Sequence, residues 1–493
     1  MAELLALLPF AVFVALLAGA RLSAAAAGLW SAAVALVVAI AGFAYPVSLA
    51  GLAGPLLEAT FIAAGILWII FPALGIYEYQ ERTGAIAEIG RWLTSFSSQP
   101  QIHALLLAWF FAMFLEGAAG FGTPIALVAP MLVGLGFPPL RALVLALLGH
   151  AAGVSFGAVG TPIVPLLEAA AVDPRALSAA IVLLHAALGW TLALLVFQLA
   201  KPAKPDTHAA WPTPFAAAAL FFIPAAALAW FAGPELPTLA GALAGGLMFA
   251  IFFRGRGAGA ESFPARTLAG AASPYLIVLF LILATRLVPP VAEWLRGIVL
   301  TWNLTEEFGG SIAPLYHPGT MLMLALLIAA AIDRNGRRVL PLALRSAAAR
   351  LPMVALALVS VLLLARFMVH GGMIETIAQT SAGLLGESWL LASPLVGALG
   401  SFVTGSATAS NIILAELQVA TSAAVGISPI LALAGQGFGS AIGNIVAPHN
   451  IVAGAATVGL VGREGEVLRK TLVPCVLYAA AGGILLLVAA ALL

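Results

Sequence analysis

EGAAGFGTP, residues 116–124, interrupts apolar sequence that extends from Leu105 to Leu135. Its three glycines and its proline disfavour a continuous helix, because glycine costs about 1 kcal/mol and proline about 3 kcal/mol in a helix interior. In lipid, unpaired backbone groups are costly, so a helix break at this depth must line a cavity or pack within protein. A broken helix also presents free N–H groups and a positive dipole end to a small anion. The stretch therefore predicts a broken membrane helix beside an anion site.

A second interruption, GSATASN at residues 405–411, divides a later apolar stretch in a comparable way. Paired interrupted segments in two halves of a chain are typical of the binding site of a secondary transporter. We therefore expect two motif regions, residues 101–172 and residues 387–462. Each region also carries glycines four residues apart, which let another backbone approach closely. These trios, each followed at the same distance by a proline, are Gly149, Gly153 and Gly157 with Pro162, and Gly435, Gly439 and Gly443 with Pro448.

The composition is that of a polytopic membrane protein. Hydrophobic residues make up 63% of the 493 residues and charged residues only 8%, whereas a soluble domain has about 25% charged residues. Lysine and arginine (21) nearly balance aspartate and glutamate (20), so no basic excess points to nucleic acid. The one cysteine, Cys475, excludes an intrachain disulfide and a multi-cysteine metal site.

Hydropathy predicts an all-α protein with about 12–14 transmembrane helices, with broken or re-entrant helices in both motif regions, in one domain over residues 1–493. The first apolar run follows Met1-Ala2-Glu3, which lacks the positive charge of a secretory signal, so we expect an uncleaved first span. The N-terminus is predicted outside, because the positive-inside rule places the basic loops in the cytoplasm. The two motif regions then enter the membrane from opposite faces, as inverted-topology repeats do. The basic loops lie near residues 201–204, 254–266, 334–350 and 463–470.

Six stretches of the sequence are EGAAGFGTP (116–124), GFPPLR (136–141), VSFGAVGTPI (154–163), TGSATASN (404–411), APHN (447–450) and GREGEVLRKTL (462–472). Together they resemble the L-lactate permease family. The resemblance extends over most of the length and implies proton-coupled uptake of lactate, or of a related 2-hydroxy monocarboxylate such as glycolate, across the bacterial cytoplasmic (inner) membrane. It also implies kinship with a broader group of ion transporters that have inverted repeats and a mobile transport domain.

The sequence departs from the family pattern at several positions of the expected site. Ala407 stands where the resemblance leads us to expect an acidic residue, Asn444 where a lysine is usual, and His449 where a glutamine is usual. His150-Ala151-Ala152-Gly153 replaces a segment that usually contains asparagine, threonine and proline. The chain therefore resembles a divergent member, for which the exact substrate, and proton versus sodium coupling, stay open.

A monocarboxylate substrate needs hydrogen-bond donors. Glycine backbones in the first break can supply N–H groups with little steric hindrance, and hydroxyl and amide side chains at both breaks can bind the carboxylate and hydroxyl groups. Serine and threonine also bond neighbouring helices in membranes, which is the alternative role for these side chains. The candidate substrate-binding residues are Gly117, Gly120, Gly122, Thr123, Ser406, Thr408, Ser410 and Asn411.

Arg286 and Arg366 are the candidate positive charges for the substrate, since both lie within apolar runs. A charge at mid-membrane costs about 2.5–3.5 kcal/mol or more, so it usually has a function. Arginine can hold a carboxylate through two parallel hydrogen bonds. The alternative is that the long side chain reaches from a span end to the interface.

Glu116 is the first candidate for proton coupling, because it is a carboxyl group deep in an apolar run beside the break. Desolvation disfavours a charged carboxyl group, which can link its protonation to the arrival of substrate. His150 is the second candidate, and Glu58, Glu168 and His370 are alternatives. Glu116 could instead cap the break and pair with an arginine.

Other function classes find less support in the sequence. It has no His-Glu-x-x-His pattern and no second cysteine, so we predict no enzyme activity, no metal site and no cofactor. A membrane subunit of a proton-pumping complex would favour lysines within spans, whereas Lys201, Lys204 and Lys470 fall at span ends. An anion channel, or a transporter of a different small carboxylate, stays open as an alternative, as does a homo-oligomer in the lipid bilayer.

Overall fold

The computed structural model describes residues 2–20, 22–120, 122–201, 209–253, 265–333 and 335–492. Within them, the secondary structure is helical apart from one antiparallel hairpin, in which β1 (Leu300–Asn303) pairs with β2 (Gly309–Ile312). Eleven helices in these residues are long and apolar enough to cross a membrane, and four shorter apolar helices accompany them. The predicted all-α polytopic membrane fold is confirmed. The predicted count of about 12–14 spans lies between the eleven long helices and the total that includes the four shorter ones.

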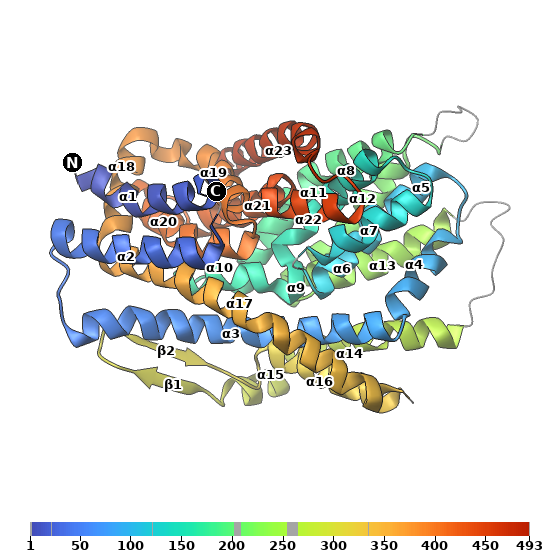
Figure 1. The fold of residues 1–493 in the computed structure, drawn as a ribbon, viewed down its shortest axis with the longest axis horizontal. Helices are drawn as coiled ribbons and strands as arrows, with labels where there is room; N and C mark the ends of the chain where they lie inside the picture. The colour runs from blue at the N-terminus through green and yellow to red at the C-terminus, as the bar shows by residue number, and fades with distance from the viewer. Residues whose placement is uncertain are drawn as a thin grey trace.

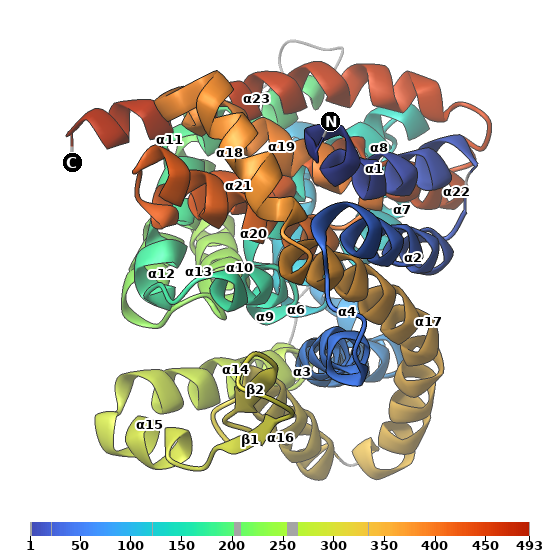
Figure 2. The ribbon, with the colours of Figure 1, turned by 90° about the vertical axis from the view of Figure 1, so that its left-hand side faces the viewer.

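The chain forms two unequal parts, which Figure 2 shows one above the other. We call the smaller part the lower layer and the larger part the upper part. The long helix α17 (Gly336–His370) connects them, because it packs against α3 of the lower layer and against α2 and α20 of the upper part. The lower layer consists of α3 (Leu49–Arg82), α14 (Ala265–Leu287), α15 (Pro289–Arg296), α16 (Pro318–Ile332) and the hairpin.

In the upper part, the first motif region contains two interrupted helices in succession (Figure 1). The helix α6 (Ala112–Ala118) stops before α7 (Thr123–Gly134). The next helix, α8 (Pro139–His150), is separated from α10 (Val164–Ala169) by three short pieces. These pieces are η3 (Ala151–Phe156), α9 (Gly157–Gly160) and η4 (Thr161–Ile163), and the region is flanked by α5 (Pro100–Ala104), η2 (Leu105–Phe111) and α11 (Pro174–Leu199).

The second motif region repeats this order. Its α19 (Trp389–Thr404) stops before α20 (Ala407–Val425), and α21 (Pro429–Gly443) is separated from α22 (Pro448–Thr457) by η7 (Asn444–Val446). The predicted broken helices are thus present in both regions, whereas the opposite orientation of the regions stays a prediction. The remaining elements are α1 (Ala2–Val14), η1 (Ala15–Gly19), α2 (Ala24–Phe43), α4 (Ala85–Thr94), α12 (Thr213–Phe231), α13 (Pro237–Phe252), α18 (Met373–Leu385), η6 (Gly386–Ser388) and α23 (Glu464–Leu492).

Proline begins many of these helices, where its missing N–H has no intrahelical partner to lose. The first residues of α8, α11, α13, α16 and α21 are Pro139, Pro174, Pro237, Pro318 and Pro429.

The helix that carries the first break is enclosed by protein. The apolar window of Pro100–Ala118 is 94% buried, against 44% for that of α2. Trp109 is fully buried and meets Phe221 and Phe222 of α12 edge to face, with ring centroids 6.0 Å apart in both pairs. A helix that is apolar on all sides belongs in the core of a large protein. The break that follows Ala118 therefore lies within protein, where irregular backbone can be tolerated.

Candidate functional site

The first break is a left-handed turn that needs glycine. Gly120 and Gly122 have φ of 60° and 79°, a region that glycine enters without steric cost. The hydroxyl of Thr123 donates a hydrogen bond to the carbonyl of Gly120 at 2.8 Å and closes the turn. The helix break predicted within residues 116–124 is confirmed.

A second turn with the same Gly-Thr-Pro sequence lies at residues 160–162. Gly160 has φ of 82°, and the hydroxyl of Thr161 donates to the carbonyl of Ala158 at 2.6 Å. Ala158 and Val159 are also left-handed, with φ of 42° and 53°. Such residues cost about 1–3 kcal/mol each and cluster at functional sites. Their strain was not foreseen from the sequence, although the repeated Gly-Thr-Pro could have drawn attention to it.

The carboxyl group of Glu116 lies between these two turns. A Cβ placed on Gly157 would collide with Oε1 of Glu116, and one placed on Gly120 would lie 3.4 Å from the same atom. Glu116 is buried. Among the described residues, its carboxyl group forms no hydrogen bond or ion pair, so the alternative of a pairing with arginine is absent there. Glu116 is therefore a buried acid whose carboxyl group has no partner within the described chain.

The breaks of the second motif region face those of the first. Gly405, with φ of 76°, precedes Ser406, whose hydroxyl accepts from the N–H of Ala409 and caps α20. A Cβ on Gly405 would lie 3.0 Å from Cβ of the exposed His449, and one on Gly122 would lie 3.9 Å from Oδ1 of Asn450. The first turn of α22 thus borders both the break at Gly405 and the break at Gly122.

His150 belongs to the same meeting point. Its Nδ1 lies 2.6 Å from the carbonyl oxygen of Ala146, and its ring interacts with the side chain of Asn444. Asn444 accepts from Nδ2 of Asn450 at 2.6 Å. His150, the second predicted proton-coupling residue, is therefore connected to the first break through Asn444 and Asn450.

Ser410 and Asn411 are bound into a buried polar network. Nδ2 of Asn411 donates to the carbonyl of Pro162 at 2.7 Å, which joins α20 to the strained turn. Nε2 of Gln436 contacts both Oγ of Ser410 (3.1 Å) and Oδ1 of Asn411 (3.2 Å), and Gln418 donates to Gln436 at 3.0 Å. The network satisfies polar groups that would be costly to bury alone.

Thr408 differs from these neighbours. It is buried in the first turn of α20, yet among the described residues its hydroxyl forms no hydrogen bond. Gly117, in contrast, is a packing position, since a Cβ there would lie 2.5 Å from the backbone nitrogen of Leu239.

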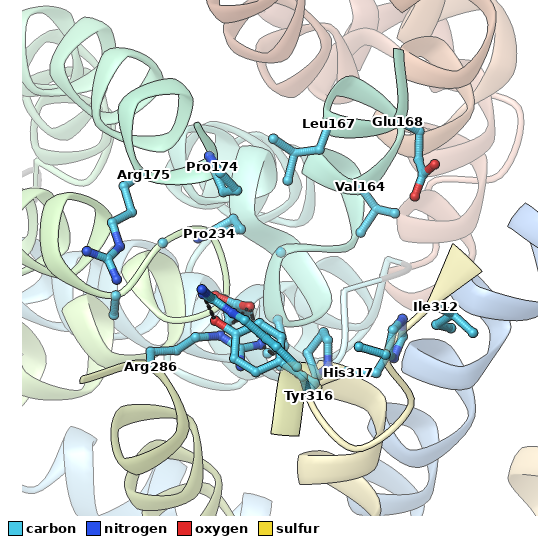
Figure 3. Close-up of a pocket in the computed structure, with 18 of the residues that line it drawn as sticks. Val164, Leu167, Glu168, Pro174, Arg175, Pro234, Arg286, Ile312, Tyr316 and His317 are labelled. Carbon is cyan, nitrogen blue, oxygen red and sulfur yellow. Dashed lines mark hydrogen bonds and ion pairs between the residues drawn. The ribbon is translucent and has the colours of Figure 1, made fainter. Parts of the chain in front are cut away.

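A cavity of about 630 Å³ lies between the lower layer and the upper part and reaches the strained turn (Figure 3). Val159 and Gly160 line it from the turn. Burial and then the charge of Arg286 lower the pKa of His317 to about 4, so this histidine is neutral near pH 7. The charged residues of the lining are Arg175, Arg286, Arg296, Glu168, Asp173 and Glu235.

The two predicted arginines occupy different places. Arg286 lines the cavity and pairs with Glu235 at 2.7 Å. Arg366 pairs with Glu416 of α20 at 2.8 Å and does not line the cavity, although its charge acts on Glu168, which does. The structure thus brings Arg286, but not Arg366, to the space beside the turn of residues 157–161.

The sequence matches the family model described as L-lactate permease over residues 2–493. The chain belongs to the L-lactate permease family. Within this family it is similar to a putative L-lactate permease of Haemophilus influenzae, with 28% identity over 456 residues, 83% of this chain and 84% of the relative. It is also similar to the glycolate permease GlcA of Escherichia coli, with 28% identity over 494 residues, 88% of each chain. The predicted resemblance is confirmed, and the chain is a multi-pass membrane transport protein.

The fold is similar to that of the YdaH transporter of Alcanivorax borkumensis. The two share a TM-score of 0.55 at 16% sequence identity, over 94% of this chain and 97% of that one. This likeness concerns the arrangement of helices.

Proposed function

We propose that this L-lactate permease family member is a secondary active transporter that couples the uptake of lactate, or of a related 2-hydroxy monocarboxylate such as glycolate, to the entry of protons. Relatives named L-lactate permease and glycolate permease support the substrate class. The single observation that carries the coupling is the buried Glu116 carboxyl group, which lies between two left-handed turns without a partner in the described chain.

In this proposal the substrate binds where the breaks meet. The amide of Gly122 and the hydroxyls of Ser406 and Thr408 donate to its carboxylate, and the hydroxyl of Thr123, which donates to Gly120, accepts from its hydroxyl group. The N–H of Gly120, a predicted donor, instead donates to the carbonyl of Leu115 at 3.2 Å and shapes the turn. A helix N-terminus such as that of α20 favours an anion through its free N–H groups and dipole. Gly117, Ser410 and Asn411 hold the surrounding helices in place through the contacts described above. Arg286, and Arg366 through its charge near Glu168, supply the positive field.

Proton coupling follows from the position of Glu116. A protonated, neutral Glu116 lets an anion approach the break, whereas a charged one repels it. His150 provides a second protonatable group, connected to the break through Asn444 and Asn450.

Transport then requires access to the site from each side of the membrane in turn. We infer that the upper part moves against the lower layer, as in transporters built from inverted repeats. The cavity faces outside in this proposal, because its rim includes the uncharged or acidic connection at residues 233–235, opposite the basic loops. The N-terminus is then outside as well.

Uptake of labelled lactate or glycolate into proteoliposomes tests this function. The proposal predicts saturable uptake that an inward proton gradient drives above equilibrium and that a protonophore abolishes. Uptake that never saturates and carries current would instead indicate an anion channel. Uptake that follows a sodium gradient at constant pH would contradict proton coupling.

A further inference from the structure

The ion pair between Arg286 and Glu235 joins the two parts of the molecule at the cavity. Arg286 lies in the last turn of α14 in the lower layer, and Glu235 lies in the connection between α12 and α13 in the upper part. Nε and Nη2 of Arg286 donate to Oε1 of Glu235 at 3.0 Å and 2.7 Å. Both side chains are at least nine-tenths buried, at 4% and 10% exposure. A movement that separates the two parts at this point must break the pair.

Arg286 is held in place by its own layer. Its Nη2 also donates to the carbonyl of Tyr316 at 3.0 Å, and its guanidinium carbon lies 3.7 Å from the centroid of the Tyr316 ring. Arg296 covers the same ring at 4.4 Å and donates to its hydroxyl. Because these contacts do not involve the upper part, the guanidinium group keeps its position when Glu235 leaves.

Only one of the two carboxylate oxygens of Glu235 is hydrogen-bonded within the described chain. Two N–H groups of Arg286 converge on Oε1, while Oε2 is buried and has no hydrogen-bond partner within the described chain. Arginine binds a carboxylate best through two parallel bonds, one to each oxygen. A free carboxylate that enters the cavity can adopt this geometry, whereas Glu235 is constrained by its backbone.

The backbone at Glu235 packs directly against the strained turn, so a displacement of Glu235 changes the contacts of that turn. A Cβ on Gly160 would lie 2.7 Å from the carbonyl oxygen of Pro234 and 3.3 Å from Cα of Glu235. On its other side, the same turn meets Glu116 through Gly157. The contacts thus run without a gap from the ion pair to the candidate proton site.

We propose that the Arg286–Glu235 pair is a latch between the lower layer and the upper part, opened when the carboxylate of the substrate replaces Glu235 on Arg286. This latch rests on the proposed function, since it assigns the monocarboxylate a first binding partner in the cavity. The substrate then binds the unlatched state more tightly than the latched state. A ligand needs such a difference in affinity to shift a conformational equilibrium.

Three variants of the full-length protein test the latch by lactate binding, measured as a concentration-dependent thermal shift in detergent. In Glu235→Gln the competitor for Arg286 loses its charge, so lactate should bind at least about 5-fold more tightly than to the wild type, the lower end of typical coupling between sites. Glu293→Gln, at an exposed acid of α15 in the same layer, should bind like the wild type.

The charge swap Arg286→Glu with Glu235→Arg separates a latch from a structural pair. It restores the opposite charges, so the unliganded protein should unfold near the wild-type temperature. Lactate should raise that temperature less than it does in the wild type, because the arginine has lost Tyr316 as its support. A folded swap variant that binds lactate like the wild type would overturn the latch, even if Glu235→Gln does not fold.

The outcomes also separate the latch from the transport proposal. Unchanged lactate affinity in Glu235→Gln, beside a wild type that transports lactate, would overturn the latch alone. A wild type that neither binds nor transports lactate or glycolate would overturn both.

Discussion

The two motif regions have the same order of interrupted helices but differ in how their polar groups are used. In the second region, Ser410 and Asn411 belong to a closed network that ends on the carbonyl of Pro162. In the first region, the carboxyl group of Glu116 has no partner among the described residues. The second region also has Ala407 where the family resemblance led us to expect an acid. In the proposed mechanism the first region therefore supplies the proton-coupling group, and the network of the second region holds the helices around it.

Removing the carboxyl group of Glu116 from the first region should have the largest effect on transport. Glu116→Gln should abolish proton-driven accumulation of lactate in proteoliposomes, because the amide cannot bind and release a proton. Exchange of internal for external lactate should continue. The exposed Glu387→Gln is the matched control and should accumulate lactate like the wild type. Full accumulation by Glu116→Gln would remove Glu116 from the coupling mechanism.

Crowding the same carboxyl group should have the next largest effect. In Gly157→Ala the new methyl group collides with Glu116. Overpacking costs about 1–3 kcal/mol, so we expect the rate of lactate uptake to fall about 10-fold or more. Gly134→Ala, where a Cβ meets nothing within 4 Å, should leave uptake unchanged. Equal uptake by the two variants would show that Glu116 does not need its present position.

The hydroxyl of Thr408 tests whether a side chain outside the polar network of the second region binds the substrate. Thr408→Val keeps the shape but removes the donor, and a hydrogen bond to a charged group contributes about 1.5–3 kcal/mol. The KM for lactate should therefore rise about 10-fold or more, with little change in the unfolding temperature. An unchanged KM would assign the hydroxyl no part in binding.

Asn411→Ala should show the reverse pattern and the smallest effect on transport. It leaves the carbonyl of Pro162 without its donor, and an unsatisfied buried group costs about 1–3 kcal/mol. We expect a lower unfolding temperature in detergent and a KM within about 3-fold of the wild type. A stable variant with a much higher KM would place Asn411 on the substrate instead.

The sequence was sufficient to predict the membrane class, the family and the positions of the breaks, because glycine, proline and apolar runs act locally. It did not predict what the polar side chains touch. Asn411 meets Pro162 across 249 residues, and Arg286 meets Glu235 across 51, and neither spacing leaves a local signal. Arg286 and Arg366 looked equivalent in the sequence, since both interrupt apolar runs. Only the packing of the lower layer against the upper part places Arg286 in the cavity.

The central claim is that the breaks of both motif regions form one carboxylate site. An experimental structure of the protein saturated with lactate tests it most directly. The account predicts lactate between the turn at Gly120–Thr123 and the start of α20 at Ser406 and Thr408, within reach of Glu116. A structure with no lactate between these two turns, and with packed side chains separating them, would contradict it, whether or not a lactate also binds Arg286.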